Sequence, residues 1–142
     1  MLNTELSLEL YWLTLSVIMT SLLWIPYIAN RILEQGILAA LWDRFGDTDT
    51  EKPWAKRMMQ AHVNAVENLV IFAPLVLLVQ LSGVNSNTTA AACMIYFFVR
   101  LAHYLSFTFA LPLLRVLTFL AGFAVQITGI HTLNRHYIST SK

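Results

Sequence analysis

The stretch Arg57–Leu78, RMMQAHVNAVENLVIFAPLVLL, decides how the chain folds. It is a long apolar segment whose first half carries side chains that lipid does not tolerate. A carboxylate near the middle of a membrane helix costs about 2.5–3.5 kcal/mol, so such a group normally faces a bundle interior or a wet cavity. The segment therefore predicts a membrane helix that contributes to a functional site. The polar side chains of its first half are Gln60, His62, Asn64, Glu67 and Asn68.

These polar side chains divide between two faces of a helix, because successive residues are about 100° apart. His62 points nearly opposite to the rest. A helix that is polar on both sides suits lipid on neither, and we expect helices or subunits on both flanks. The larger group either fixes helix packing as a polar network or binds a charged ligand, and its mixture of charges favours the ligand. This group consists of Arg57, Gln60, Asn64, Glu67 and Asn68.

Composition places the whole chain in a membrane. Its 142 residues predict one domain over residues 1–142. Hydrophobic residues make up 57% and charged residues 12%, whereas a soluble domain carries roughly 25% charged residues. Mean hydropathy is +0.61. The formal net charge of +1 argues against a nucleic-acid partner, and the single cysteine, Cys93, excludes an internal disulfide. No Cys/His spacing typical of a metal site is present.

The hydrophobic pattern predicts four helices at about residues 6–33, 53–82, 88–109 and 113–135. Residues 10–28 contain no charge, which is enough to cross a bilayer at about 20 residues per helix. Residues 36–52 form the longest polar connection, with a short interfacial helix expected around residues 37–42. Pro53 opens the second helix and Pro112 marks a tight break before the fourth. The predicted fold class is all-α, an integral membrane four-helix bundle.

Basic side chains near the helix ends are further candidates for a site. Arg100, His103 and Phe107 share one face of the third helix, where arginine and histidine are unfavourable unless they face a cavity. Arg115 lies in the first turn of the fourth helix. Arg31, at the end of the first, is either a snorkelling anchor or a ligand contact, and Arg115 has the same bland alternative as a partner of lipid phosphate.

Loop charges predict the orientation of the chain. Seven of the nine basic residues lie at the first and third connections, and only Arg135 and Lys142 lie at the other side. The positive-inside rule places those connections in the cytoplasm and both termini outside. The basic groups and the polar half of the second helix then gather at the cytoplasmic end. The seven residues are Arg31, Arg44, Lys52, Lys56, Arg57, Arg100 and Arg115.

The sequence RMMQAHVNAVEN at residues 57–68 resembles the signature of the MAPEG superfamily, the membrane-associated proteins of eicosanoid and glutathione metabolism. The RLAH sequence at residues 100–103 and the PLLR sequence at residues 112–115 are similar to the third-to-fourth helix region of its bacterial members. The resemblance covers nearly the whole chain. It implies four-helix protomers assembled as a homotrimer, with glutathione between neighbouring subunits near the cytoplasmic face.

The resemblance also implies roles for single residues. Asn64 and Glu67 match positions that hold the γ-glutamyl end of glutathione, and Arg31 matches one that meets a glutathione carboxylate. Arg115 matches the arginine credited with stabilising the thiolate, and is the candidate catalytic residue. Gln60 stands where several catalytic members have arginine, and Phe107 where several have tyrosine. The candidate glutathione contacts together are Arg31, Arg57, Gln60, His62, Asn64, Glu67, Asn68, Arg100, His103 and Phe107.

Two functions follow from the resemblance. One is a glutathione transferase or peroxidase, active in detoxification, that acts on lipophilic electrophiles reaching it through membrane lipid. The other is a lipid-binding or scaffolding membrane protein without turnover, since the family includes a non-enzymatic member. The expected location is a multi-pass position in a bacterial inner membrane.

Overall fold

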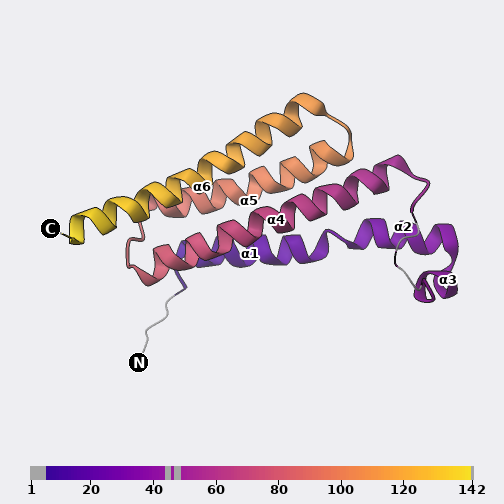
Figure 1. The fold of residues 1–142 in the computed structure, drawn as a ribbon, viewed down its shortest axis with the longest axis horizontal. Helices are drawn as coiled ribbons and strands as arrows, with labels where there is room; N and C mark the ends of the chain where they lie inside the picture. Colours follow the sequence, from indigo (N-terminus) through magenta and orange to yellow (C-terminus); the bar gives the residue numbers. More distant parts are fainter. Residues whose placement is uncertain (1–5, 44–45, 47–48, 142) are drawn as a thin grey trace.

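The computed structural model describes residues 6–43, 46 and 49–141. Over these residues the chain is built of helices and contains no strand, so the predicted all-α fold is confirmed. Figure 1 shows the longer helices running along the length of the molecule, with the short third helix folded at one end. The helices are α1 (Leu8–Leu22), α2 (Ile25–Gln35), α3 (Ile37–Leu41), α4 (Pro53–Leu81), α5 (Asn87–Thr108) and α6 (Pro112–Thr140).

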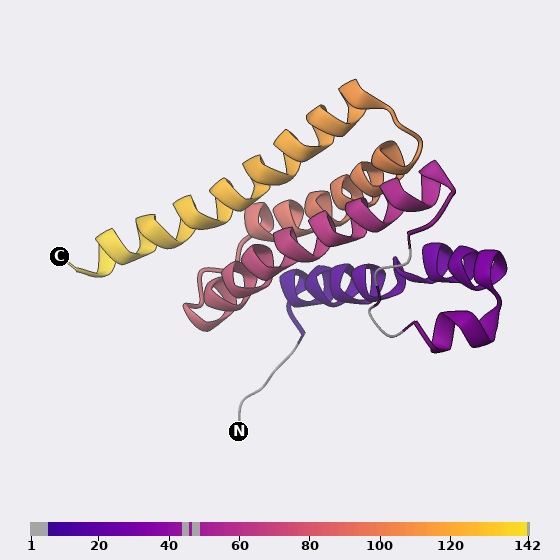
Figure 2. The ribbon, with the colours of Figure 1, turned by 45° about the vertical axis from the view of Figure 1, so that its right-hand side comes forward.

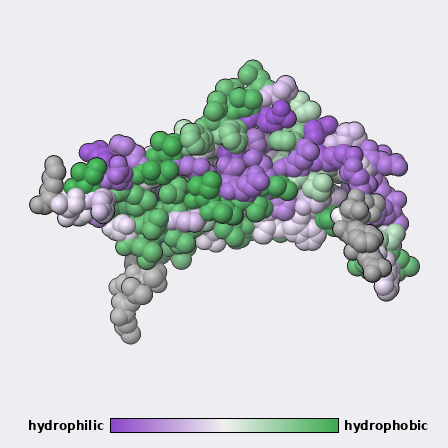
Figure 3. Space-filling model, in the orientation of Figure 1, coloured by the Kyte–Doolittle hydropathy of each residue, from purple (hydrophilic) through white to green (hydrophobic). Residues whose placement is uncertain are grey.

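Four helical segments are long and apolar enough to cross a membrane, as predicted for an integral multi-pass membrane protein. They are α1 together with α2, and then α4, α5 and α6. Many large apolar side chains on these helices are exposed, and Figure 3 shows hydrophobic residues over a large part of the face it draws. In lipid such a surface needs no further cover, because the acyl chains are as apolar as the side chains.

The first span differs from the single helix predicted for residues 6–33, because the chain turns between α1 and α2 at Leu23 and Trp24. Pro26 causes the interruption, since proline lacks the N–H that would bond to the carbonyl four residues earlier and its ring clashes with that carbonyl. The carbonyl of Leu23 at the break accepts a hydrogen bond of 2.9 Å from the hydroxyl of Tyr104 on α5. A side chain on another helix therefore satisfies the polar backbone at the break.

The other helix ends follow from local sequence. Pro53 and Pro112 open α4 and α6, where the first N–H groups have no helical partner in any case. Ser86 and Thr89 form a capping box at the start of α5. Between α5 and α6 the chain turns sharply at Ala110, whose φ of 56° lies in the left-handed region that favours glycine.

Helix α4 is central in the bundle. It packs against α1, α2, α5 and α6, and α1 also packs directly against α5. The interior between α4 and α5 includes the rings of Phe72 and Tyr96, stacked with centroids 3.6 Å apart. The start of α4 and the α5–α6 turn lie at the same end of the bundle as α3, while the α4–α5 turn and the end of α6 lie at the opposite end (Figures 1 and 2).

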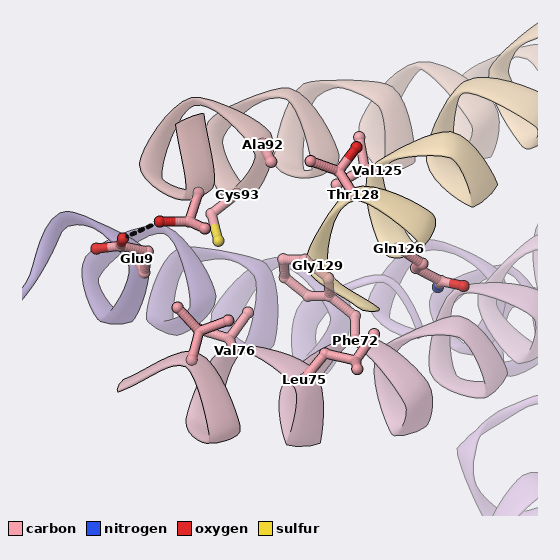
Figure 4. A pocket seen from close by; sticks show the side chains of 12 residues that line it. Glu9, Phe72, Leu75, Val76, Ala92, Cys93, Val125, Gln126, Thr128 and Gly129 are labelled. Carbon is pink, nitrogen blue, oxygen red and sulfur yellow. Dashed lines mark hydrogen bonds between the residues drawn. The ribbon is translucent and has the colours of Figure 1, made fainter. Parts of the chain in front are cut away.

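A small cavity lies between α1, α4, α5 and α6, away from the predicted site (Figure 4). Its volume of about 20 Å³ leaves room for about one water molecule. Glu9 lies in its wall, is buried, and accepts a 2.5 Å hydrogen bond from the hydroxyl of Thr89 and a 3.4 Å bond from the N–H of Ser86. Glu9 thus ties the start of α1 to the start of α5, a contact that sequence reasoning missed.

Candidate functional site

The two faces of α4 contact different parts of the molecule. Asn64 and Asn68 lie toward α5 and α6, where they hydrogen-bond to Arg100 and Gln126 respectively. His62 lies toward α2, where its Nδ1 is 2.8 Å from the hydroxyl of Tyr27. The separation of His62 from Asn64 and Asn68 that helical periodicity predicted is therefore present in the structure, and it divides most of the candidate residues into two groups.

Arg100 is the most buried cation of the first group, with 2% of its surface exposed. Its Nη1 donates a 3.3 Å hydrogen bond to Asn64 Oδ1. Its Cζ lies 5.6 Å from the ring centroid of Tyr96 and 6.0 Å from that of Phe119, within the range of cation–π attraction. Its Nε and Nη2 are buried without a hydrogen-bond partner among the described residues. Arg100 therefore combines a buried positive charge with unused donors, which is typical of a site that accepts an anion.

The amide side chains of α4 and α6 extend this cluster. Asn68 Nδ2 donates to the Asn64 carbonyl at 2.8 Å and lies 3.4 Å from Asn64 Oδ1. Gln126 Nε2 lies 3.5 Å from Asn68 Oδ1 and 3.4 Å from the Asn68 carbonyl. Sequence reasoning missed Gln126, although a signal existed: Gln126 follows Arg115 by about three helical turns, so the two share a face of α6.

A pocket of about 220 Å³ opens beside this cluster, between α4, α5 and α6. Arg115 lies in its wall, with its Cζ 4.9 Å from the ring centroid of Phe107. Among the residues that the structure describes, no aspartate or glutamate lines the pocket. Its chemistry is therefore that of a cation, an amide and an imidazole set in apolar walls. The lining residues are Asn64, His103, Phe107, Arg115, Val116, Phe119 and Leu120.

His103 joins α5 to α6 beneath this pocket. Its Nδ1 lies 3.1 Å from the backbone carbonyl of Arg115 and 3.1 Å from Thr118 Oγ1. A carbonyl only accepts hydrogen bonds, so we assign the donated proton to Nδ1. The backbone that carries Arg115 is thereby fixed to α5. Thr118, which also donates to the Leu114 carbonyl at 2.8 Å, was not among the residues predicted from sequence.

The second group of candidate residues lies on the other flank of α4. Arg31, near the end of α2, forms an ion pair with Asp43, which follows α3. Both side chains line a pocket of about 280 Å³ between α2 and α3. His62 and Tyr27 lie on the same flank, with ring centroids 5.8 Å apart. A single chain therefore does not bring Arg31 and His62 together with Asn64 and Arg115.

The remaining candidates lie outside both groups. Arg57 Nε donates a 2.9 Å hydrogen bond to the carbonyl of Thr108, which ties the start of α4 to the end of α5. This contact gives Arg57 a structural role in the chain. Gln60 and Glu67 are exposed on α4. Over residues 6–43, 46 and 49–141, no three His, Cys, Asp or Glu side chains converge as metal ligands.

Comparison with known families identifies the fold. The model of the MAPEG family matches residues 10–133, which is most of the chain. The chain belongs to the MAPEG family. The matched range contains every candidate residue from Arg31 to Arg115, and the predicted resemblance is confirmed. No curated protein and no solved structure is similar enough to the chain to match.

Proposed function

We propose that this MAPEG protein is a membrane-bound glutathione transferase or peroxidase that acts on lipophilic electrophiles. One observation carries the proposal: Arg115 lines a pocket with amide and imidazole groups and, over the described part of the chain, no carboxylate. Such a pocket favours an anion, and the reactive form of glutathione is its thiolate. The neighbouring Arg100, buried with two unpartnered nitrogens in the described structure, adds to the positive potential.

The chemistry asks little of the protein beyond placing charge. A free thiol has a pKa near 8.5, and a neighbouring cation lowers it. Lowering the thiol pKa from about 8.5 to about 7.5 requires the site to favour the thiolate over the thiol by about 1.4 kcal/mol. Arg115 would stabilise the thiolate, whose sulfur attacks the electrophile directly. The apolar walls formed by Val116, Phe119 and Leu120 would receive that electrophile from the lipid.

The rest of glutathione would be held by candidate residues from both flanks of α4. Asn64 and Glu67 would bind the γ-glutamyl end, and Arg31 a carboxylate. Arg31 lies on the opposite flank of α4 from the Arg115 pocket, so we propose that a neighbouring copy supplies it and that the protein is a homotrimer. The exposure of Gln60 and Glu67 in a single chain supports this arrangement, because an assembly would cover them.

The orientation follows from the charges. We propose that both termini lie outside the cytoplasm and that glutathione binds near the cytoplasmic face of a bacterial inner membrane. Arg31 lies near the end of α2, and Arg57 and Arg115 lie within the first two turns of α4 and α6, so all three are at one end of the bundle. Soluble glutathione would reach the site from that side.

A second function has one observation in its favour. Phe107 packs against the Arg115 guanidinium and has no hydroxyl to offer a bound thiol. A pocket of this kind also suits a lipid with an anionic head, held without turnover. This candidate is a lipid-binding or scaffolding membrane protein.

Turnover and the thiolate signal separate the two functions. The purified protein in detergent should bind glutathione in calorimetry, should show the near-ultraviolet absorption of a thiolate below pH 8.5, and should conjugate a chlorodinitrobenzene electrophile. Arg115→Leu should lose the thiolate signal and turnover while keeping much of the affinity. Arg135→Leu, which removes an exposed arginine of the same helix, is the control. Binding without any thiolate signal would favour the non-enzymatic function, and no binding at all would reject the proposal.

A further inference from the structure

Gly122 on α6 lies directly against the guanidinium of Arg100. A Cβ added at Gly122 would overlap Arg100 Nη2, and would lie 2.8 Å from Cζ and 3.0 Å from Nε. Carbon atoms in proteins do not approach so closely, so any larger residue would displace either the guanidinium or the helix. The Arg100 guanidinium therefore occupies the space that a side chain at position 122 would fill.

The position of Arg100 matters because it orients Asn64. Asn64 Oδ1 lies 3.3 Å from Arg100 Nη1 and 3.4 Å from Asn68 Nδ2. Both partners are N–H donors, so the oxygen of the Asn64 amide must be the atom that faces them. The amide nitrogen of Asn64 is then left for the pocket, whose wall Asn64 helps to form. The pocket gains an N–H donor by this arrangement.

We propose that Gly122 is a positioning residue of the ligand site, acting through Arg100 on Asn64. By leaving room for the guanidinium, Gly122 keeps the Asn64 amide turned so that its N–H groups meet a carboxylate of the bound ligand. The inference rests on the proposed function, in which that ligand is glutathione. It predicts that the size of residue 122 controls ligand affinity although residue 122 does not touch the ligand.

The same helix offers a matched control. Gly129 lies about two turns beyond Gly122 on α6. A Cβ added there would have Leu75 Cβ at 4.0 Å as its nearest neighbour, which is ordinary van der Waals contact. Gly129→Ala therefore makes the same chemical change without displacing a charged group.

The experiment measures glutathione affinity by calorimetry for the full chain in detergent. We expect Gly122→Ala to weaken binding by about tenfold or more, and Gly129→Ala to change it by less than about twofold. In turnover assays the Michaelis constant for glutathione should rise in Gly122→Ala more than that for the electrophile. Equal affinities of the two alanine variants would overturn the inference while leaving the proposed function intact.

A double-mutant cycle on the thermal midpoint tests whether the effect passes through Arg100. Gly122→Ala should lower the midpoint of the wild-type protein and should leave that of Arg100→Met unchanged or raised, because the overlapping guanidinium is gone. An equal loss in both backgrounds would show that Gly122 serves general helix packing, and would overturn the inference. A wild-type protein that binds no glutathione would instead reject the proposed function, and with it the ligand that Gly122 is proposed to serve.

Discussion

Arg100 and Arg31 differ in their exposure to solvent and in whether a carboxylate neutralises their charge. Arg100 is 2% exposed and contacts amide and aromatic groups, with no carboxylate partner in the described structure. Arg31 has a side chain that is 22% exposed, and Asp43 of its own chain neutralises it. Removing a charge from water costs several kcal/mol, roughly, unless an opposite charge compensates. In the proposed function, the α4–α5–α6 cluster would therefore accept an anion from outside the chain, whereas a ligand of Arg31 would first have to displace Asp43.

The largest expected effect comes from removing the uncompensated arginine. Arg100→Met should weaken glutathione binding by about 2–5 kcal/mol, because it removes both a buried positive charge beside the pocket and the donor that orients Asn64. The ligand-free protein should keep or gain thermal stability, because methionine has no charge to bury. Calorimetry and thermal unfolding check the two halves. A strong loss of stability in the ligand-free variant would mean that Arg100 is a structural cation.

Substitutions on the two faces of α4 should differ almost as much in their effect on glutathione affinity. Glu67→Gln should weaken glutathione binding by up to about 2–5 kcal/mol if the carboxylate pairs with the ligand's amine in a partly desolvated site. His62→Ala should weaken it less, since His62 bonds to Tyr27 on the other flank. Calorimetry on both variants gives the order. Equal and negligible effects would mean that the polar residues of α4 serve helix packing.

A smaller effect is expected at the α2–α3 ion pair, where one substitution should lower the stability and raise the affinity for glutathione. Asp43→Asn should destabilise the ligand-free protein by about 1–2 kcal/mol, a value reduced from that of a fully buried pair because Arg31 is partly exposed. The same change should strengthen glutathione binding, since the ligand carboxylate no longer competes with Asp43 for Arg31. Thermal unfolding with and without glutathione measures both. Unchanged affinity would remove Arg31 from the ligand site.

The smallest effect is expected at the exposed ion pair between Asp49 and Lys56, which serves as the control for Asp43. The hydrogen bond from Lys56 holds the pKa of Asp49 below its usual value. A carboxyl group whose pKa is lowered by folding stabilises the fold above its unfolded pKa, and this stabilisation is lost as the pH falls through the lowered value. Asp49→Asn should therefore lower the thermal midpoint slightly at pH 7. At a pH below the lowered pKa of Asp49 it should leave the midpoint unchanged. A shift as large as that of Asp43→Asn would contradict the ranking.

Periodicity could predict much of this cluster and little of its detail. The hydrophobic pattern predicted the spanning helices, and the 100° rule separated His62 from Asn64 on α4. The cost of placing an arginine in an apolar helix made Arg100 a candidate, and in the structure Arg100 is buried and hydrogen-bonds to Asn64. These inferences succeed because burial of charge and helical spacing are local properties of the sequence.

The features that escaped prediction depend on contacts between distant residues. Nothing in the α6 sequence alone shows that Gly122 faces a guanidinium on α5. The pairing of Arg31 with Asp43 depends on the turn at Gly36, whose φ of 80° sends α3 back from α2. Position along a helix therefore identified which residues were candidates, and only the packed structure shows which of them are already partnered.

The contact between Glu9 and Thr89 has a consequence for the order in which the protein is made. The two residues are 80 positions apart, so the α1 carboxylate leaves the ribosome long before its partner exists. At about 5–20 residues per second, roughly 4–16 s of synthesis separate them. Because an unpartnered carboxylate is costly in hydrocarbon, we expect Glu9 to stay at the membrane interface during that interval and α1 to reach its final depth only after α5 has entered the bilayer. On this expectation, α1 finishes its membrane insertion only when α5, the third spanning segment, is in place.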